Sequence, residues 1–223
     1  MLENSVTSTS LPIGRYFGIP LRMHFTFLIY LIVRFQQFNN NPLFGFLLVA
    51  GFALSIILHE YGHALAAKKY GGWPEEVILW QFGGLAICRE PRSLIGSLAT
   101  TVGGPLVTLA LVGLFSGSAG MLQTMANPAM HGLVRLAQEL ARFNLLALVF
   151  NLIPAFPMDG GRLLRDLLAF HTGRYQATTL ALTISRYLAV LALIAGLVFA
   201  NVTLVVLSVF LFMATGWRSG PRF

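Results

Sequence analysis

Apolar segments near the length of a membrane span constrain the fold of this chain more than any other feature. A helix needs roughly 20 predominantly apolar residues to cross the hydrocarbon core of a bilayer. We predict six such spans, at about residues 23–40, 43–67, 94–116, 132–153, 178–200 and 202–217. Only 10% of the 223 residues are charged, whereas about a quarter are charged in soluble proteins. The sequence therefore predicts an all-α polytopic membrane protein that uses the lipid bilayer as its solvent.

Basic residues fall mainly on one side of the predicted membrane. With six spans and an internal N-terminus, most of the 15 Lys and Arg residues lie in inner segments. These are Arg15, Arg22, Lys68, Lys69, Arg89, Arg92, Arg162, Arg165, Arg174, Arg218 and Arg222. Because cytoplasmic loops carry such an excess, we expect a plasma-membrane protein with both termini in the cytoplasm. Arg142 and Arg186 lie within predicted spans, and the sequence identifies no partner for either.

The net charge of +7 does not indicate a nucleic-acid partner. Basic residues that bind nucleic acid cluster on one face, often with interleaved aromatic residues. Here they are scattered between apolar runs. We therefore expect no binding of nucleic acid.

The segment WPEEVILWQFGGLAICREP, between the second and third spans, is too short and too interrupted to cross the membrane. Two β-prone runs, EEVILW and LAICRE, are joined through Gly83 and Gly84, which predicts a small membrane-associated β-hairpin. The exposed edge of such a hairpin can accept an extended peptide as an added strand. A surface loop packed on the helices explains the segment equally well, and the residues alone leave both readings open.

The motif His59-Glu60-Tyr61-Gly62-His63 lies inside the second predicted span. Histidines at i and i+4 share one helix face, with Cβ atoms about 5–6 Å apart, and can bind one Zn²⁺ together. Glu60 points about 60° away from His63, at roughly 100° per residue. It can therefore reach a water molecule beside the ion without being a ligand. Ionisable groups in a span are costly unless they serve a function or find partners, which argues against a chance match.

A catalytic zinc needs a third protein ligand at the same membrane depth. Depth excludes His131 and disfavours Glu139, because both lie near the outer surface. The remaining candidates are His24, Cys88, Asp159 and His171. Asp159 is the best placed, since it follows the fourth span in the turn NLIPAFPMDGG, where prolines stop the helix and glycines permit close backbone approach. A helix N-cap is the alternative role for Asp159.

The two motifs together resemble the site-2 protease family of intramembrane zinc metalloproteases. In that family the HExxH motif supplies two histidine ligands and a catalytic glutamate, and the Asn-x-x-Pro-x-x-Pro-x-Asp-Gly motif supplies an aspartate ligand. The resemblance thus implies His59, His63 and Asp159 as ligands of one Zn²⁺ per chain, with Glu60 as the base. It covers the second to fourth spans well, and a six-span plan fits prokaryotic members.

The resemblance also implies roles outside the ligand set. Asn151 corresponds to a donor to the oxyanion, although a structural hydrogen bond in the turn is an equal alternative. Phe82-Gly83-Gly84 resembles the β segment of the family, which would hold the substrate. One departure concerns Gly104-Pro105-Leu106-Val107-Thr108, which has Thr108 where the family usually has Asn. That difference puts a local hydrogen bond in doubt, but not the metal site.

The function implied is an intramembrane zinc endopeptidase that cuts membrane-anchored proteins within or near the cytoplasmic side of the bilayer. We expect residues 1–223 to form a single metalloprotease domain without a PDZ or CBS module, and transmembrane proteins to be its substrates. One alternative is a non-catalytic membrane scaffold, which would need no base at Glu60. The other is a metal transporter, which would have ligands at several depths and repeated halves.

Overall fold

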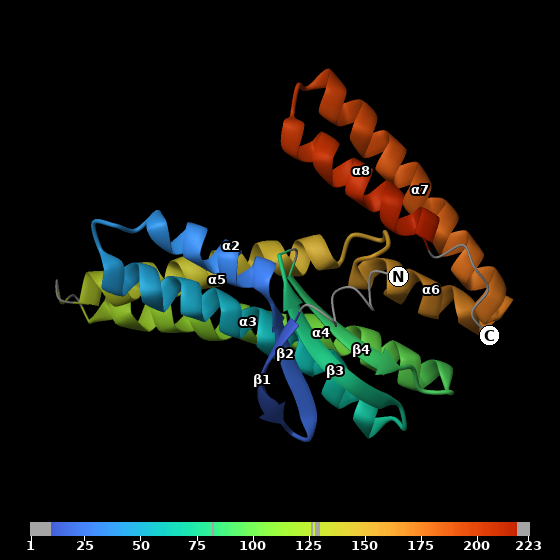
Figure 1. Ribbon diagram of the computed structural model, residues 1–223, viewed down its shortest axis with the longest axis horizontal. Coiled ribbons are helices and arrows are strands. Elements are labelled where there is room, and N and C mark those ends of the chain that lie inside the picture. The colour runs from blue at the N-terminus through green and yellow to red at the C-terminus, as the bar shows by residue number, and fades with distance from the viewer. Residues whose placement is uncertain (1–9, 82, 126, 128–129, 218–223) are drawn as a thin grey trace. The chain divides into compact units, whose positions relative to one another are not determined.

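The computed structural model describes residues 10–81, 83–125, 127 and 130–217 (Figure 1). The chain forms two compact units, residues 1–148 and 149–223. The first contains a small sheet and most of the long helices, and the second contains three helices. The prediction of a single domain is not tested by this division and stays a prediction.

The first unit alternates strands and helices. Its elements are β1 (Ser10–Tyr16), β2 (Ile19–His24), α2 (Phe25–Gln36), α3 (Pro42–Lys69), β3 (Trp73–Trp80), β4 (Gly83–Arg89), α4 (Leu94–Thr124) and α5 (His131–Asn151), which runs into the second unit. The strands form one sheet in the order β1-β2-β3-β4. β2 and β3 are parallel because α2 and α3 connect them, and the other two pairs are antiparallel.

The hairpin predicted between the second and third spans is present as β3 and β4, with Trp80 opposite Gly83. The sheet is nevertheless larger than predicted, because β1 and β2 precede the first helix. The predicted first span, 23–40, therefore begins in a strand and continues as the 12-residue helix α2. Pro12, Gly14, Gly18 and Pro20 disfavour helix before residue 24, and Gly18 takes a φ of 80° in the turn between the strands.

Among the described residues, three helices are long and apolar enough to cross a membrane, namely α3, α4 and α7 (Arg174–Val198). Residues 25–36 and 202–215 form shorter apolar helices. The predicted span at 132–153 is helical as α5 but more polar, since it carries Arg135, Glu139 and Arg142. The chain is thus a mainly helical, multi-pass membrane protein. The prediction of six spans is supported for three helices and stays a prediction for the others.

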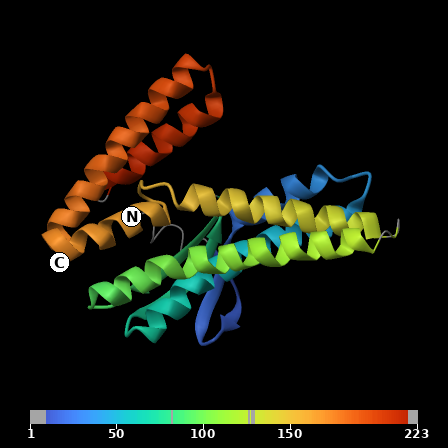
Figure 2. The same ribbon diagram turned by 180° about the vertical axis from the view of Figure 1, so that it is seen from behind.

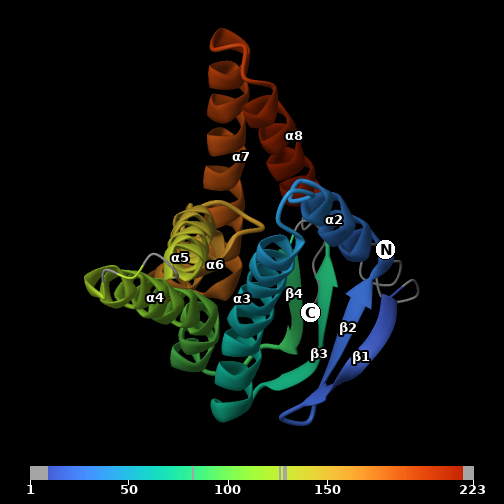
Figure 3. The ribbon, with the colours of Figure 1, turned by 90° about the vertical axis from the view of Figure 1, so that its left-hand side faces the viewer.

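Helix α3 lies between the sheet and helix α4, and α4 and α5 lie on the side away from the sheet (Figures 2 and 3). Tyr61 and Ala64 of α3 pack on Val77 and Leu79 of β3. On the other side, a Cβ added to Gly62 would lie 2.5 Å from the Gly103 carbonyl oxygen. The two backbones therefore touch, as small residues allow between membrane helices.

Helix α5 packs on the N-terminal half of α3. Leu140 joins a cluster with Leu48 and Phe52, and the buried Asn144 amide donates to Ser55 Oγ at 3.0 Å. The sequence identified no partner for Arg142. In the structure, its Nη1 atom lies 3.6 Å from Oε1 of Glu139, one turn earlier in α5. These contacts hold the part of α3 that precedes the HEYGH motif.

The second unit contains α6 (Asp159–Thr172), α7 and α8 (Val202–Trp217). The turn before α6 packs on α7, where Phe156 contacts Ala181 and Leu182 and its N–H donates to Ser185 Oγ at 2.9 Å. Helices α7 and α8 form an antiparallel pair (Figure 1). Arg186 of α7 donates to the Thr215 carbonyl of α8 at 3.4 Å, which gives this intramembrane arginine a backbone partner.

Candidate metal centre

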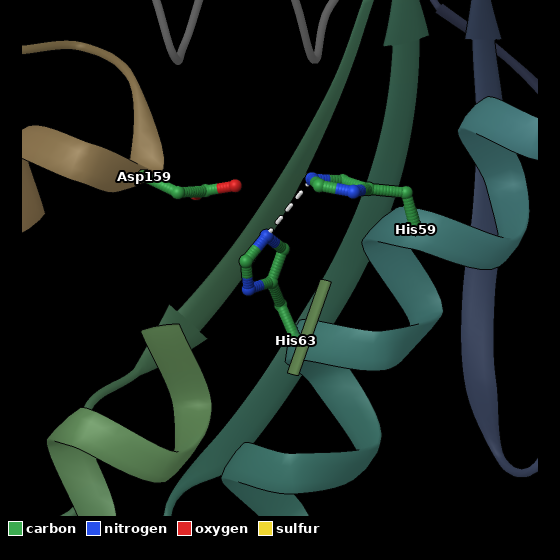
Figure 4. Close-up of side chains that lie close together, drawn as sticks. All are labelled: His59, His63 and Asp159. Atoms are coloured by element: carbon green, nitrogen blue, oxygen red, sulfur yellow. Dashed lines mark hydrogen bonds between the residues drawn. The ribbon is translucent and has the colours of Figure 1, made fainter. Parts of the chain in front are cut away.

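The two histidines of the HEYGH motif lie on successive turns of α3, on the face that contacts α4. His59 and His63 are 7% and 2% exposed. Their rings are nearly perpendicular, at 83°, and their Nε2 atoms approach within 3.2 Å (Figure 4). The i, i+4 spacing thus brings two imidazole nitrogens to one buried point, as the sequence predicts.

The other nitrogen of each ring contacts α4. His63 Nδ1 lies 2.8 Å from the Thr100 carbonyl oxygen. A carbonyl only accepts hydrogen bonds, so His63 Nδ1 carries the hydrogen and Nε2 keeps the lone pair that binds a metal. The Gly104 N–H lies 3.4 Å from the same Nδ1 atom, and this longer contact is secondary. His59 Nδ1 lies 2.7 Å from Thr108 Oγ1.

Glycine at position 104 makes room for the second imidazole. A Cβ placed there would lie 2.2 Å from His63 Nε2. Because that atom is the predicted donor to the metal, any larger residue at 104 would occupy the ligand position itself. Helix α4 therefore shapes the site through a missing side chain as well as through hydrogen bonds.

The carboxylate of Glu60 points to a different neighbour, strand β4. Glu60 is 8% exposed, and its Oε2 accepts a hydrogen bond from the Ala86 N–H at 2.9 Å. A Cβ added to Gly84 would lie 2.2 Å from Glu60 Cγ. The predicted base is thus fixed by the backbone of the hairpin, and Gly84 is required for that approach.

Asp159 is the first residue of α6 and is 8% exposed. The N-cap position belongs to Met158, without a side-chain cap, so Asp159 does not have the alternative N-cap role. Gly160 and Gly161 let the preceding turn fold back, since added Cβ atoms would lie 2.3 Å from the Ile153 carbonyl oxygen and 2.5 Å from the Ala155 carbonyl carbon. The NLIPAFPMDGG turn is therefore tightly folded where α6 begins.

His59, His63 and Asp159 form a buried group that could hold one metal ion (Figure 4). One donor atom of each lies within 4.8 Å of the others. Two imidazoles and one carboxylate are a donor set that zinc accepts in catalytic sites, with a fourth position left for water or substrate. The residues therefore fit zinc.

The other candidates for the third ligand do not belong to this group. His24 is the N-cap of α2, where its Nδ1 accepts from the Thr26 N–H at 3.3 Å. Cys88 is a half-buried thiol in β4, and His171 is exposed in the last turn of α6. Among the described residues, the group that could hold a metal thus includes Asp159 and none of the other candidates, and the ligand role of Asp159 stays a prediction.

The roles of the ligands and the base stay predictions, as do those of the other predicted site residues. Asn151 is the half-buried last residue of α5. Phe82 lies outside the described residues. Gly83 begins β4 with a φ of 128°, which favours glycine, and Gly84 contacts the base.

Sequence reasoning named Gly104 and Thr108 but missed their contacts with the histidines, and it missed Thr100 altogether. Thr100, Gly104 and Thr108 are all buried and recur every four residues along α4. Small and polar residues at this spacing share one helix face, and inside an apolar helix such a row indicates close packing against a polar neighbour. This row was the available signal.

Known proteins resemble this chain, some of them over nearly its whole length. The sequence profile of Peptidase family M50 matches residues 92–195. A zinc metalloprotease of Methanocaldococcus jannaschii is 35% identical over 214 residues, which cover 94% of this chain and 60% of that protein. Stage IV sporulation protein FB of Bacillus subtilis is 33% identical over 114 residues, 50% of this chain and 36% of that protein. The chain thus spans less than two thirds of these curated relatives.

A solved structure matches the fold as well. The site-2 protease from Methanocaldococcus jannaschii superposes with a TM-score of 0.68 at 32% identity, over 96% of this chain and 97% of that one. Sequence profile, relatives and structure therefore agree, and the chain belongs to the site-2 protease family of zinc metalloproteases, Peptidase family M50.

Proposed function

We propose that this chain is a zinc endopeptidase that hydrolyses peptide bonds of membrane-anchored proteins within or near the cytoplasmic side of the bilayer. The observation that carries the proposal is a buried group of two imidazoles and a carboxylate, together with a second buried carboxylate, Glu60, that is held by other contacts. This division between ligands and base is the one that metal-assisted peptide hydrolysis requires.

The proposed mechanism assigns one task to each group. Zinc, when bound by His59, His63 and Asp159, would lower the pKa of water towards 7 and polarise a peptide carbonyl. Glu60 accepts the proton of the attacking water and passes it to the leaving amine nitrogen. The Asn151 amide donates to the carbonyl oxygen as it gains negative charge.

The substrate has to be partly unwound before it is cut. A transmembrane helix hides its carbonyl groups in its own hydrogen bonds. Strand β4 is the last strand of the described sheet, and its edge offers backbone groups to an extended segment. We propose that the segment from Phe82 to Gly84 binds the substrate at this edge, in a single domain with six spans and both termini in the cytoplasm of a plasma-membrane protein.

A cleavage assay on the purified full chain tests this proposal. A transmembrane model substrate should be cut, and a zinc chelator should abolish the cutting. Glu60→Gln should retain zinc but lose activity by roughly 10²- to 10⁴-fold, the usual contribution of a general base. Cleavage that persists in Glu60→Gln at the native rate would contradict the protease role and favour the scaffold or transporter alternatives, neither of which a specific contact supports.

A further inference from the structure

The inference concerns Thr108, which lies on the face of α4 that contacts His59 and His63. Thr108 is 2% exposed, and its Oγ1 makes two contacts. It lies 2.7 Å from His59 Nδ1 and donates to the Gly104 carbonyl oxygen, one turn earlier in α4, at 3.3 Å. The hydroxyl thus lies between the helix backbone and one imidazole.

The direction in which the Thr108 hydroxyl donates its single hydrogen determines the tautomer of the His59 imidazole. A threonine hydroxyl has one hydrogen to donate and lone pairs to accept. Since the hydrogen goes to the Gly104 carbonyl, the oxygen accepts from His59 Nδ1. Nδ1 then carries the ring hydrogen, which leaves the lone pair on Nε2. His63 has the same tautomer, because its Nδ1 donates to the Thr100 carbonyl.

We propose that Thr108 is a positioning residue that fixes the tautomer and ring orientation of His59, so that both Nε2 lone pairs are available to the zinc. The 3.2 Å separation of the two Nε2 atoms supports this. When both Nδ1 atoms carry the ring hydrogens, both Nε2 atoms keep the lone pairs that can bind one cation together. A partner on the far nitrogen of a ligand histidine typically changes metal affinity 10- to 100-fold.

The row of Thr100, Gly104 and Thr108 on α4 contacts the far ring nitrogens of both histidines. Thr100 serves His63 through its carbonyl, which any residue at position 100 provides. Thr108 serves His59 through its side chain, so this half of the arrangement depends on residue type. Substitution can therefore test it directly, and asparagine would place a different donor–acceptor group at the same position.

The experiment compares the native full chain with Thr108→Val, Thr108→Ser and Thr108→Asn. Zinc affinity is measured by competition with a chelator, without substrate. Valine has the shape of threonine but no hydroxyl, so we expect 10- to 100-fold weaker zinc binding. Serine keeps the hydroxyl and should bind zinc within a few-fold of the native protein, as should asparagine.

Two further measurements separate positioning from packing. Thermal unfolding of the zinc-free protein should differ little between Thr108→Val and the native chain. Nitrogen NMR of ¹⁵N-histidine in zinc-free protein should show the hydrogen of His59 on Nδ1 in the native chain and a changed tautomer in Thr108→Val. Native zinc affinity in Thr108→Val, or equal losses in Thr108→Val and Thr108→Ser, would overturn the proposal.

The cleavage role rests on the proposed function, but the zinc measurement does not need it. If the native chain binds zinc yet cleaves nothing, the proposed function fails and the role of Thr108 stands on the affinities. If the native chain cleaves and Thr108→Val binds zinc normally, the role of Thr108 fails alone.

Discussion

Helix α3 is held at the HEYGH motif by two different regions, α4 and β4. On the α4 side, the Thr100 carbonyl and the Thr108 hydroxyl contact the far nitrogens of the two histidines. On the β4 side, the Ala86 N–H binds the Glu60 carboxylate. The side chains of neighbouring residues in one part of α3 are thus held in position by separate elements, the histidines by α4 and Glu60 by β4. The difference implies that metal binding and proton transfer can be impaired independently.

Gly104→Ala should produce the largest effect, on the α4 side. The new Cβ would lie 2.2 Å from His63 Nε2, and the ring cannot keep its place. We expect zinc affinity to fall by about 100-fold or more, at or beyond the upper end for groups around a metal, with activity falling in parallel. Chelator competition measures the affinity.

Gly113→Ala is the matched control, because a Cβ at Gly113 of the same helix meets nothing within 4 Å. It should bind zinc and cleave as the native chain does. Normal zinc affinity in Gly104→Ala would show that α4 does not shape the ligand site.

Gly84→Ala should produce the next effect, on the β4 side. Its Cβ would lie 2.2 Å from Glu60 Cγ, so the base must move. We expect kcat to fall by roughly 100-fold, the lower end of a general base's contribution, while zinc content stays native. A loss of zinc together with activity would remove the distinction between the two sides.

Ala86→Pro should act on the same side more weakly. In an antiparallel strand, the backbone N–H groups of alternate residues point away from the partner strand. The N–H of Ala86 is one of these, since it donates to Glu60. Proline is tolerated at such edge positions. Losing one hydrogen bond to a charged group should lower kcat roughly 10- to 100-fold, with zinc retained. Ile87→Pro is the contrasting variant, because Ile87 pairs with Glu76 of β3 and the next N–H along the strand is expected to point to the partner strand, so its loss should destabilise the hairpin. Native kcat in a folded Ala86→Pro protein would show that this N–H does not hold the base.

The smallest effect is expected away from both sides. Asn144 of α5 donates to Ser55 Oγ at 3.0 Å and to the Leu140 carbonyl at 2.8 Å. Hydrogen bonds between membrane helices contribute about 0.6 kcal/mol on average, so Asn144→Leu should lower the free energy of unfolding by about that amount. Zinc affinity and kcat should not change. An unfolding titration measures the free energy of unfolding. A change in zinc affinity would show that α5 also helps to hold the metal ligands.

The sequence predicted the parts of the site that follow from local spacing. His59 and His63 share a face because they are four residues apart, and the prolines and glycines around Asp159 predicted its turn. The β3–β4 hairpin followed from its β-prone runs and glycines. These features depend on neighbours along the chain, so they can be derived without tertiary structure.

Contacts between distant elements could not be derived in this way. β1 and β2 come before α2, and β2 joins the sheet by pairing with β3, where Leu21 lies opposite Val77, 56 residues later. The Thr108 contact with His59 spans 49 residues, and the Ala86 contact with Glu60 spans 26. Thr108 looked like a lost hydrogen bond because only its difference from Asn was visible.

The zinc content of purified Asp159→Ala, measured by elemental analysis beside the native chain, tests the central claim most directly. One zinc per native chain is expected, because His59, His63 and Asp159 form a single group. With two ligands left, the variant should lose most of its zinc during purification. A full zinc ion retained in Asp159→Ala, at native affinity, would contradict the metal site.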